Sequence, residues 1–194
     1  MPPVPPAPDH GAGLESSPAR HRLFFALVPP DAVRARIADA VAGLRAQAGG
    51  ARWVRTSRYH LTLAFLGEHR VLDASLIARL QARGRATAAA VGPFEWVADR
   101  IDCLHARRPP CVLLGASPCE PLQALHLRLR EPPPATGDAS PFVPHVTLAY
   151  LEHALPAAVP LQRALAWPVD AIELLHGEPG RPDYRSLGGW PLGR

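Results

Sequence analysis

Two short segments of the chain repeat one pattern of chemically active residues. YHLTLAFLG occupies residues 59–67 and PHVTLAYLE occupies residues 144–152, and each contains His, one further residue, Thr, Leu and Ala in that order. His60 and His145 are 85 positions apart, in a chain that has nine His among 194 residues. One short match carries a false-positive risk, whereas two longer matches indicate a shared role.

If both segments are β-strands, each His shares a face with the Thr two positions later. Side chains alternate along a strand, so His60 and Thr62 point to one side, as do His145 and Thr147, while the aliphatic residues between them point to the other. Each strand would then bury its aliphatic side chains and present one His–Thr pair. We expect two lobes that face each other, so that both pairs line one cleft.

Two imidazoles and two hydroxyls in one cleft suit in-line displacement at phosphorus. The unperturbed pKa of an imidazole is about 6.5, so one His can accept a proton from the nucleophile while the other donates one to the leaving oxygen. The Thr hydroxyls would donate hydrogen bonds to the non-bridging oxygens. This scheme requires no metal ion. The alternative, an exposed polar strand face without chemistry, suits one copy of the pattern better than two.

The basic residues of the chain are all Arg. The sequence contains 21 of them and no Lys. This excludes a Walker A phosphate loop, and it excludes reactions through a Schiff base or a lysyl–nucleotide intermediate, because each needs a Lys. The net charge of +4 favours anionic partners, and a guanidinium can bind phosphate through two hydrogen bonds. A genomic base-composition bias that replaces Lys by Arg is the alternative explanation.

Neither a membrane segment nor a metal site is expected from the sequence. No run approaches the roughly eighteen apolar residues of a membrane helix, and the N-terminus lacks a secretory signal, so we expect a cytoplasmic protein. The seven His outside the two motifs show no metal-ligand spacing. Cys103, Cys111 and Cys119 form no Cys-x-x-Cys pair, so reduced, partly buried thiols are expected.

The pattern of apolar residues predicts an α+β fold. Residues 1–20 are rich in Pro, Gly and Ser and are predicted to form a disordered tail, which leaves residues 21–194 as a single bilobal domain. Helical spacing predicts helices over 31–48, 73–84 and 122–129. Segments bounded by Gly or Pro predict strands over 22–28, 51–55, 60–66, 93–101, 111–116, 143–150, 168–175 and 184–190. Several strands follow one another directly, so mainly antiparallel pairing and two related halves are expected.

Beyond the two motifs, four segments resemble one known family. RLFFALVPP at 22–30, RWVRTSRYHLTLAFLGE at 52–68, PFVPHVTLAY at 141–150 and YRSLGGWPL at 184–192 are similar to landmarks of the two-histidine (2H) phosphoesterase superfamily. The resemblance is strongest to its bacterial branch of RNA 2′,3′-cyclic phosphodiesterases, also called 2′-5′ RNA ligases. It extends over residues 22–192.

The resemblance implies a bilobal fold with two mainly antiparallel sheets and flanking helices around a central cleft, a pseudo-twofold axis, and no metal or nucleotide cofactor. It implies a monomer that hydrolyses an RNA 2′,3′-cyclic phosphate end, or a small cyclic nucleotide, to the 2′-phosphomonoester. His60 would be the proton donor to the 3′ oxygen, His145 the acceptor that activates water, and Thr62 and Thr147 the phosphate ligands. The alternatives are 2′-5′ ligation of tRNA halves and binding of RNA ends without turnover.

One position departs from the family pattern. Members of the family often have Arg shortly after the second motif, where it can contact phosphate, whereas this chain has Tyr150. Arg55 is the candidate to supply the missing charge, with Arg22 and Arg58 as alternatives. Tyr150 itself could stack on a base. For each of these residues, a solvated Arg or a packed aromatic is the other interpretation.

Overall fold

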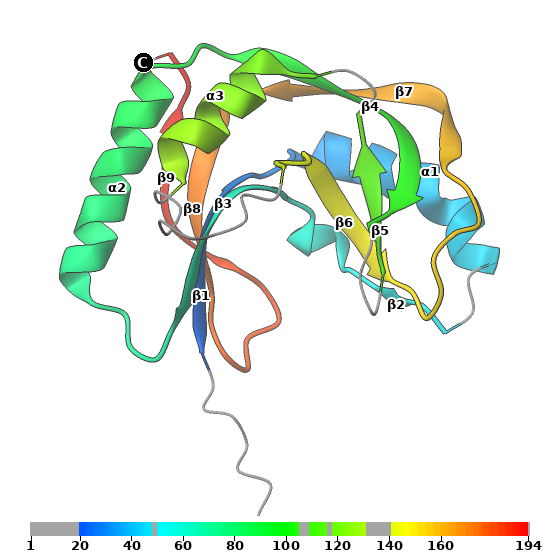
Figure 1. Ribbon diagram of the computed structural model, residues 1–194, viewed down its shortest axis with the longest axis horizontal. Coiled ribbons are helices and arrows are strands. Elements are labelled where there is room, and N and C mark those ends of the chain that lie inside the picture. Colours follow the sequence, from blue (N-terminus) through cyan, green and yellow to red (C-terminus); the bar gives the residue numbers. More distant parts are fainter. Residues whose placement is uncertain (1–19, 48–49, 105–108, 116–117, 131–140, 194) are drawn as a thin grey trace, which may run out of the picture.

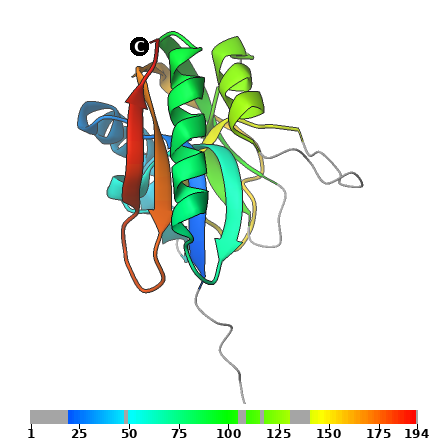
Figure 2. The same ribbon diagram turned by 90° about the vertical axis from the view of Figure 1, so that its left-hand side faces the viewer.

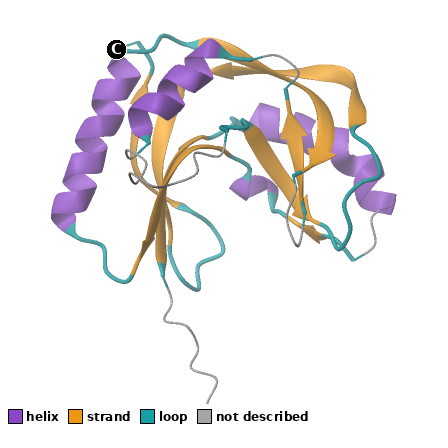
Figure 3. Cartoon of the chain, viewed as in Figure 1, coloured by secondary structure: helices purple, strands orange, loops and turns teal. Residues whose placement is uncertain are grey.

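The computed structural model of the chain describes residues 20–47, 50–104, 109–115, 118–130 and 141–193. The described part contains three α-helices, one 3-10 helix and nine strands (Figures 1 and 3). The helices are α1 (Asp31–Gln47), α2 (Ala74–Ala89), α3 (Glu120–Leu129) and the 3-10 helix η1 (Thr56–Arg58). The strands are β1 (His21–Leu27), β2 (Arg52–Trp53), β3 (Leu61–His69), β4 (Phe94–Cys103), β5 (Pro110–Leu114), β6 (His145–Tyr150), β7 (Val159–Val169), β8 (Ala171–Gly177) and β9 (Arg185–Pro191).

The strands form one antiparallel sheet with two similar halves. Its order is β7-β4-β5-β6-β3-β1-β8-β9, and the short strand β2 pairs with β6 beside this path. Figure 1 shows the two halves as separate lobes. We call the half with β1, β3, β8, β9, α2 and α3 lobe A, and the half with β2, β4 to β7 and α1 lobe B. The lobes meet at the β3–β6 pair, so the two expected sheets are joined through the two motif strands.

The chain passes repeatedly between the lobes. It leaves β1 of lobe A for α1, which packs on β7 of lobe B, and it leaves β5 of lobe B for α3, which packs on β3 of lobe A. In Figure 2, α2 and α3 cover one face of the lobe A sheet. The apolar side chains of that face, such as Leu23 and Phe25 in β1, are fully buried in the main core. The opposite face of lobe A is therefore left for the site.

Local sequence signals account for the helix boundaries. Asp73 caps α2 by accepting a hydrogen bond from the backbone N–H of Ser75, the usual role of an Asp at this position. α3 has Pro121 in its first turn, where the missing backbone N–H costs no hydrogen bond. All three predicted helices are present, and the predicted α+β class is confirmed.

The strand predictions differ from the structure at two places. β7 was not expected except for its last two residues, which were assigned to the strand predicted over 168–175, because Val159–Val169 contains Pro160, Pro168 and the polar residues Gln162 and Arg163. β7 is an edge strand that pairs only with β4, and an edge strand tolerates Pro because half of its N–H groups face away from the sheet. The strand expected at 51–55 is shortened to Arg52–Trp53, because η1 follows it.

Two further expectations concern the N-terminal tail and a membrane-spanning helix. The predicted tail, residues 1–20, lies outside them except for Arg20. Among the helices that the structure describes, none has the length and apolar character that crossing a membrane requires.

Candidate active site

The two motifs meet at the centre of the sheet. Leu61 of β3 is paired with Val146 of β6 in antiparallel register. One step to either side of this pair, the register sets His60 opposite Thr147 and Thr62 opposite His145. Directly opposite residues in such a pair have Cβ atoms about 5 Å apart, and diagonal ones about 7 Å. The two His–Thr pairs therefore form one cluster, which we call the motif quartet (His60, Thr62, His145 and Thr147).

Burial follows the alternation that the sequence predicted. The aliphatic side chains that flank the quartet along both strands are buried in the main core, and these are Leu61, Leu63, Val146 and Leu148. The members of the quartet are all partly exposed. Burial of the aliphatic side chains fixes the register, because a slip by one residue would turn them to solvent and the His–Thr pairs inward.

The two imidazoles are held by equivalent hydrogen bonds. His60 Nδ1 lies 2.8 Å from the backbone oxygen of Arg58, and His145 Nδ1 lies 2.7 Å from the backbone oxygen of Val143. In each case the acceptor is the carbonyl two residues before the His. A carbonyl can only accept, so Nδ1 of each neutral ring carries the proton and Nε2 keeps a free lone pair. Both rings are thus prepared to exchange a proton through Nε2.

His60 lies in an apolar environment that opposes its charge. Its ring centroid is 5.0 Å from that of Phe24 and 5.1 Å from that of Tyr184. Burial lowers the pKa of His60 to about 4, and the positive charges of Arg58 and His145 also lower it, while the hydrogen bond to the Arg58 carbonyl has the opposite effect. The influence of His145 agrees with the closeness that the register requires. Without a ligand, His60 is neutral at pH 7.

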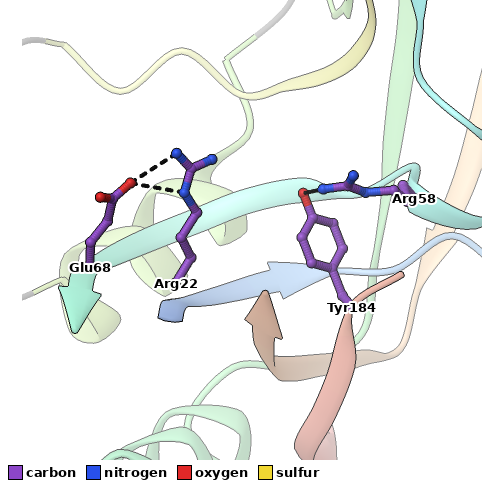
Figure 4. A network of polar contacts seen from close by, with 4 residues as sticks. All are labelled: Arg22, Arg58, Glu68 and Tyr184. Carbon is purple, nitrogen blue, oxygen red and sulfur yellow. Dashed lines mark hydrogen bonds and ion pairs between the residues drawn. The ribbon is translucent and has the colours of Figure 1, made fainter. Parts of the chain in front are cut away.

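Arg58 and Tyr184 form a contact that the sequence did not identify as a pair. Arg58 Nη2 donates a 2.6 Å hydrogen bond to the Tyr184 hydroxyl, and the guanidinium carbon lies 4.3 Å from the centroid of the Tyr184 ring. Figure 4 shows this pair near the start of β3. Arg58 Nε is buried and has no hydrogen-bond partner. In the part of the chain that the structure describes, no carboxylate pairs with Arg58.

A cavity of about 190 Å³ opens beside His60. Its lining includes Arg58 and Tyr184, and also Arg34, whose Nε is likewise buried without a hydrogen-bond partner. Further lining residues with polar side-chain groups are Ser57, Tyr59, Glu173 and Ser186. A spacing argument could not have found this cavity, because its walls come from α1, η1, β8 and β9.

The other predicted binding residues lie farther out. Arg55 is exposed directly before η1 and does not line the cavity. Tyr150 is exposed at the end of β6, and the guanidinium of Arg52 lies 4.5 Å from its ring centroid. Arg22 forms an ion pair of 2.9 Å with Glu68 (Figure 4). Within the described ranges, no group of His, Cys, Asp or Glu side chains could hold a metal ion.

Comparison with known proteins agrees with this geometry. The family model described as the 2′-5′ RNA ligase superfamily matches residues 29–181, which is most of the chain and includes the whole quartet. The chain belongs to this superfamily. It is 30% identical over 184 residues to the RNA 2′,3′-cyclic phosphodiesterase of Thermus thermophilus, and the alignment covers 86% of this chain and 87% of that protein.

Solved structures of the superfamily share the fold. The apo crystal structure of E. coli LigT has a TM-score of 0.68 and 26% sequence identity, with 91% of this chain and 99% of LigT covered. The crystal structure of LigT complexed with 3′-AMP has a TM-score of 0.67 and 25% identity, with 90% and 99% covered. The resemblance inferred from the paired motifs is confirmed, and this member of the 2′-5′ RNA ligase superfamily is a phosphoesterase of the two-histidine type.

Proposed function

We propose that this chain is an RNA 2′,3′-cyclic phosphodiesterase that hydrolyses the cyclic phosphate to a 2′-phosphomonoester. The observation that supports the proposal is the antiparallel pair Leu61–Val146 of β3 and β6, beside which both His–Thr pairs share one face of the sheet. The name of the Thermus thermophilus relative supports the same reaction.

In the proposed reaction, His145 Nε2 accepts a proton from water as the water oxygen attacks phosphorus. The bond between phosphorus and the 3′ oxygen breaks, and His60 Nε2 donates a proton to that oxygen. His60 must be protonated for this step, and its low pKa makes the protonated ring a strong acid. The negative charge of a bound phosphate beside the ring raises the pKa and so supplies the protonated form.

Arg58 is the proposed cationic ligand of the phosphate, together with the hydroxyls of Thr62 and Thr147. It lines the cavity beside His60, its Nε has no other partner, and Tyr184 fixes the plane of its guanidinium. A guanidinium held in this way loses little further side-chain freedom when it binds an anion. Arg55, which is exposed, is the less favourable candidate.

The decisive experiment is hydrolysis of a 2′,3′-cyclic nucleotide by purified protein in EDTA. The expected product is the 2′-phosphate. His60→Ala and His145→Ala should each reduce kcat by roughly 10²- to 10⁴-fold, the usual contribution of a general acid or base. His153→Ala is the matched control, because His153 is exposed shortly after β6 and outside the quartet.

A change of the leaving group distinguishes the roles of the two His. With a substrate whose 3′ oxygen is replaced by sulfur, departure needs no proton, so the donor variant His60→Ala should regain most of its activity and His145→Ala should not. If His145→Ala regained its activity instead, His145 would be the proton donor and His60 the acceptor. If wild-type protein bound the substrate without hydrolysing it, the chain would be an RNA-end-binding protein, and near-full activity of either single variant would refute the two-histidine mechanism.

A further inference from the structure

His126 of α3 contacts the backbone of the first motif strand from the face opposite the quartet. Its Nδ1 lies 2.7 Å from the backbone oxygen of Leu63 in β3. A carbonyl oxygen can only accept, so Nδ1 of His126 carries a hydrogen and donates the bond. α3 packs on β3 and covers the face of lobe A that lies away from the site (Figure 2). This contact therefore reaches the motif strand from the core side.

The carbonyl that His126 binds belongs to an irregularity of β3 directly after the motif. The pairing of β3 with β1 includes Thr62 and Ala64 but leaves Leu63 as an extra residue. Leu63 and Ala64 are both buried, so the alternation of faces shifts by one residue and Phe65 is exposed. The extra residue of such a bulge is left unpaired in the ladder. The hydrogen bond from His126 supplies a partner and fixes the backbone one residue beyond Thr62.

The ring of His126 also contacts the segment that leads into the second motif strand. It is stacked on the ring of Phe142, with the centroids 4.1 Å apart and the planes inclined by 2°. Phe142 is partly buried against the main core, and residues 141–144 belong to no strand. The next residue is Val143, whose carbonyl oxygen lies 2.7 Å from His145 Nδ1. The stack thus fixes the neighbour of the carbonyl that sets the tautomer of His145.

One side chain outside both motifs is therefore in contact with both half-sites. Its N–H group holds the backbone beside Thr62, and its ring holds the residue beside the hydrogen-bond acceptor of His145. The half-sites must stay aligned, because in-line displacement needs both imidazoles and both hydroxyls around one phosphorus atom. A displacement of about 1 Å can lower the rate of such a reaction roughly 100-fold.

We propose that His126 is a positioning residue that aligns the two His–Thr pairs from the core side of the sheet. It acts through Leu63 and Phe142 and does not itself touch the substrate. The inference rests on the proposed function, since it concerns alignment for attack at phosphorus. Without these contacts, β3 and the segment before β6 can shift independently of each other, and the quartet loses its common geometry.

Three substitutions separate the two contacts. His126→Asn keeps an N–H donor where Nδ1 was, because both nitrogens are bonded to Cγ, but it lacks the ring. His126→Phe keeps the ring and lacks the donor, and His126→Leu lacks both. With a 2′,3′-cyclic nucleotide, kcat should fall about threefold to tenfold in the Asn and Phe variants, the range for one hydrogen bond or one aromatic pair, and further in the Leu variant. KM should stay within about twofold, because the groups that bind substrate remain.

The tautomer of His145 gives a second measurement that does not depend on turnover. In ¹⁵N NMR spectra of labelled imidazoles, the His145 signals are assigned by their absence from His145→Gln. Wild-type protein should show the Nδ1–H tautomer, since Nδ1 donates to the Val143 carbonyl. His126→Phe should retain this tautomer, whereas His126→Asn and His126→Leu should show a mixture of both tautomers, because they lack the stack on Phe142. A general loss of stability would not distinguish the Phe variant from the Asn variant.

His69→Phe is the matched control. His69 Nε2 lies 3.1 Å from the backbone oxygen of Leu66, so this substitution removes the same kind of hydrogen bond from the same strand, farther from the quartet. It should leave kcat and the His145 tautomer unchanged. Wild-type kcat together with the wild-type tautomer in His126→Leu would overturn the proposal, as would a loss of kcat in His69→Phe equal to that in His126→Phe. If wild-type protein failed to hydrolyse a cyclic phosphate, the proposed function would be refuted, and the tautomer of His145 would still decide the role of His126.

Discussion

The protonation of His60 offers the sharpest test of the site, because the burial of its ring predicts the direction of the effect and its approximate size. The pKa falls from 6.5 to about 4, mainly because burial disfavours the charged ring. This difference corresponds to about 3 kcal/mol between the protonated and neutral forms. Between pH 6.5 and 4, residue 60 binds a proton in the unfolded chain but not in the folded one. The contribution of neutral His60 to stability is therefore complete above pH 6.5 and is lost as the pH falls toward 4.

Two assays measure this effect. The first is an NMR titration of the ¹³C-labelled imidazoles of ligand-free protein, in which the His60 signal is assigned by its absence from His60→Gln. The midpoint should lie near 4 and should rise when a nucleoside 2′-phosphate is added, because the bound anion stabilises the imidazolium. The second is urea unfolding at several pH values. The free energy of unfolding should fall on acidification by up to about 3 kcal/mol more in the wild type than in His60→Gln.

A midpoint at or above 6.5 without ligand would show that the ring is solvated, and the packing of Phe24 and Tyr184 around it would then have no electrostatic consequence. A phosphate ligand that leaves the midpoint unchanged would contradict the proposed position of the phosphate beside His60. Identical pH dependence of unfolding in the wild type and the variant would exclude the stability effect.

Three other predictions concern the surroundings of the site. Tyr184→Phe keeps the ring over Arg58 but removes a hydrogen bond to a charged group, so kcat/KM for a cyclic nucleotide should fall about tenfold and Tm should fall slightly; an unchanged kcat/KM would argue against Arg58 as a phosphate ligand. Replacement of Gly by Ala inside a helix normally stabilises it. In Gly84→Ala, however, the added Cβ would overlap the ring of Trp190, so Tm should fall in a thermal melt. A rise in Tm would show that the ring can move. Burial raises the pKa of Cys111 to about 12, so iodoacetamide at pH 8 should leave this thiol unmodified in folded protein and alkylate it in urea; rapid alkylation without urea would show that the strand opens.

The sequence alone identified the two His–Thr pairs as candidates for the chemistry and determined which strand faces they occupy. His and Thr two positions apart, with buried aliphatics between them, require only the alternation of a strand, and this pattern appears in the burial of both motif strands. Helical periodicity likewise identified α1, α2 and α3, since each contains a stripe of apolar residues. These features are local, so the order of residues is sufficient to predict them.

Tertiary structure alone decided what surrounds those residues. Arg58 and Tyr184 are 126 positions apart, and no motif links them, yet they meet beside His60. The low pKa of His60 depends on burial among side chains from β1 and the segment before β9, and the exposure of Phe65 depends on an extra residue in β3. Strand pairing and desolvation depend on contacts between distant segments, and such contacts are established only when the whole sheet is assembled.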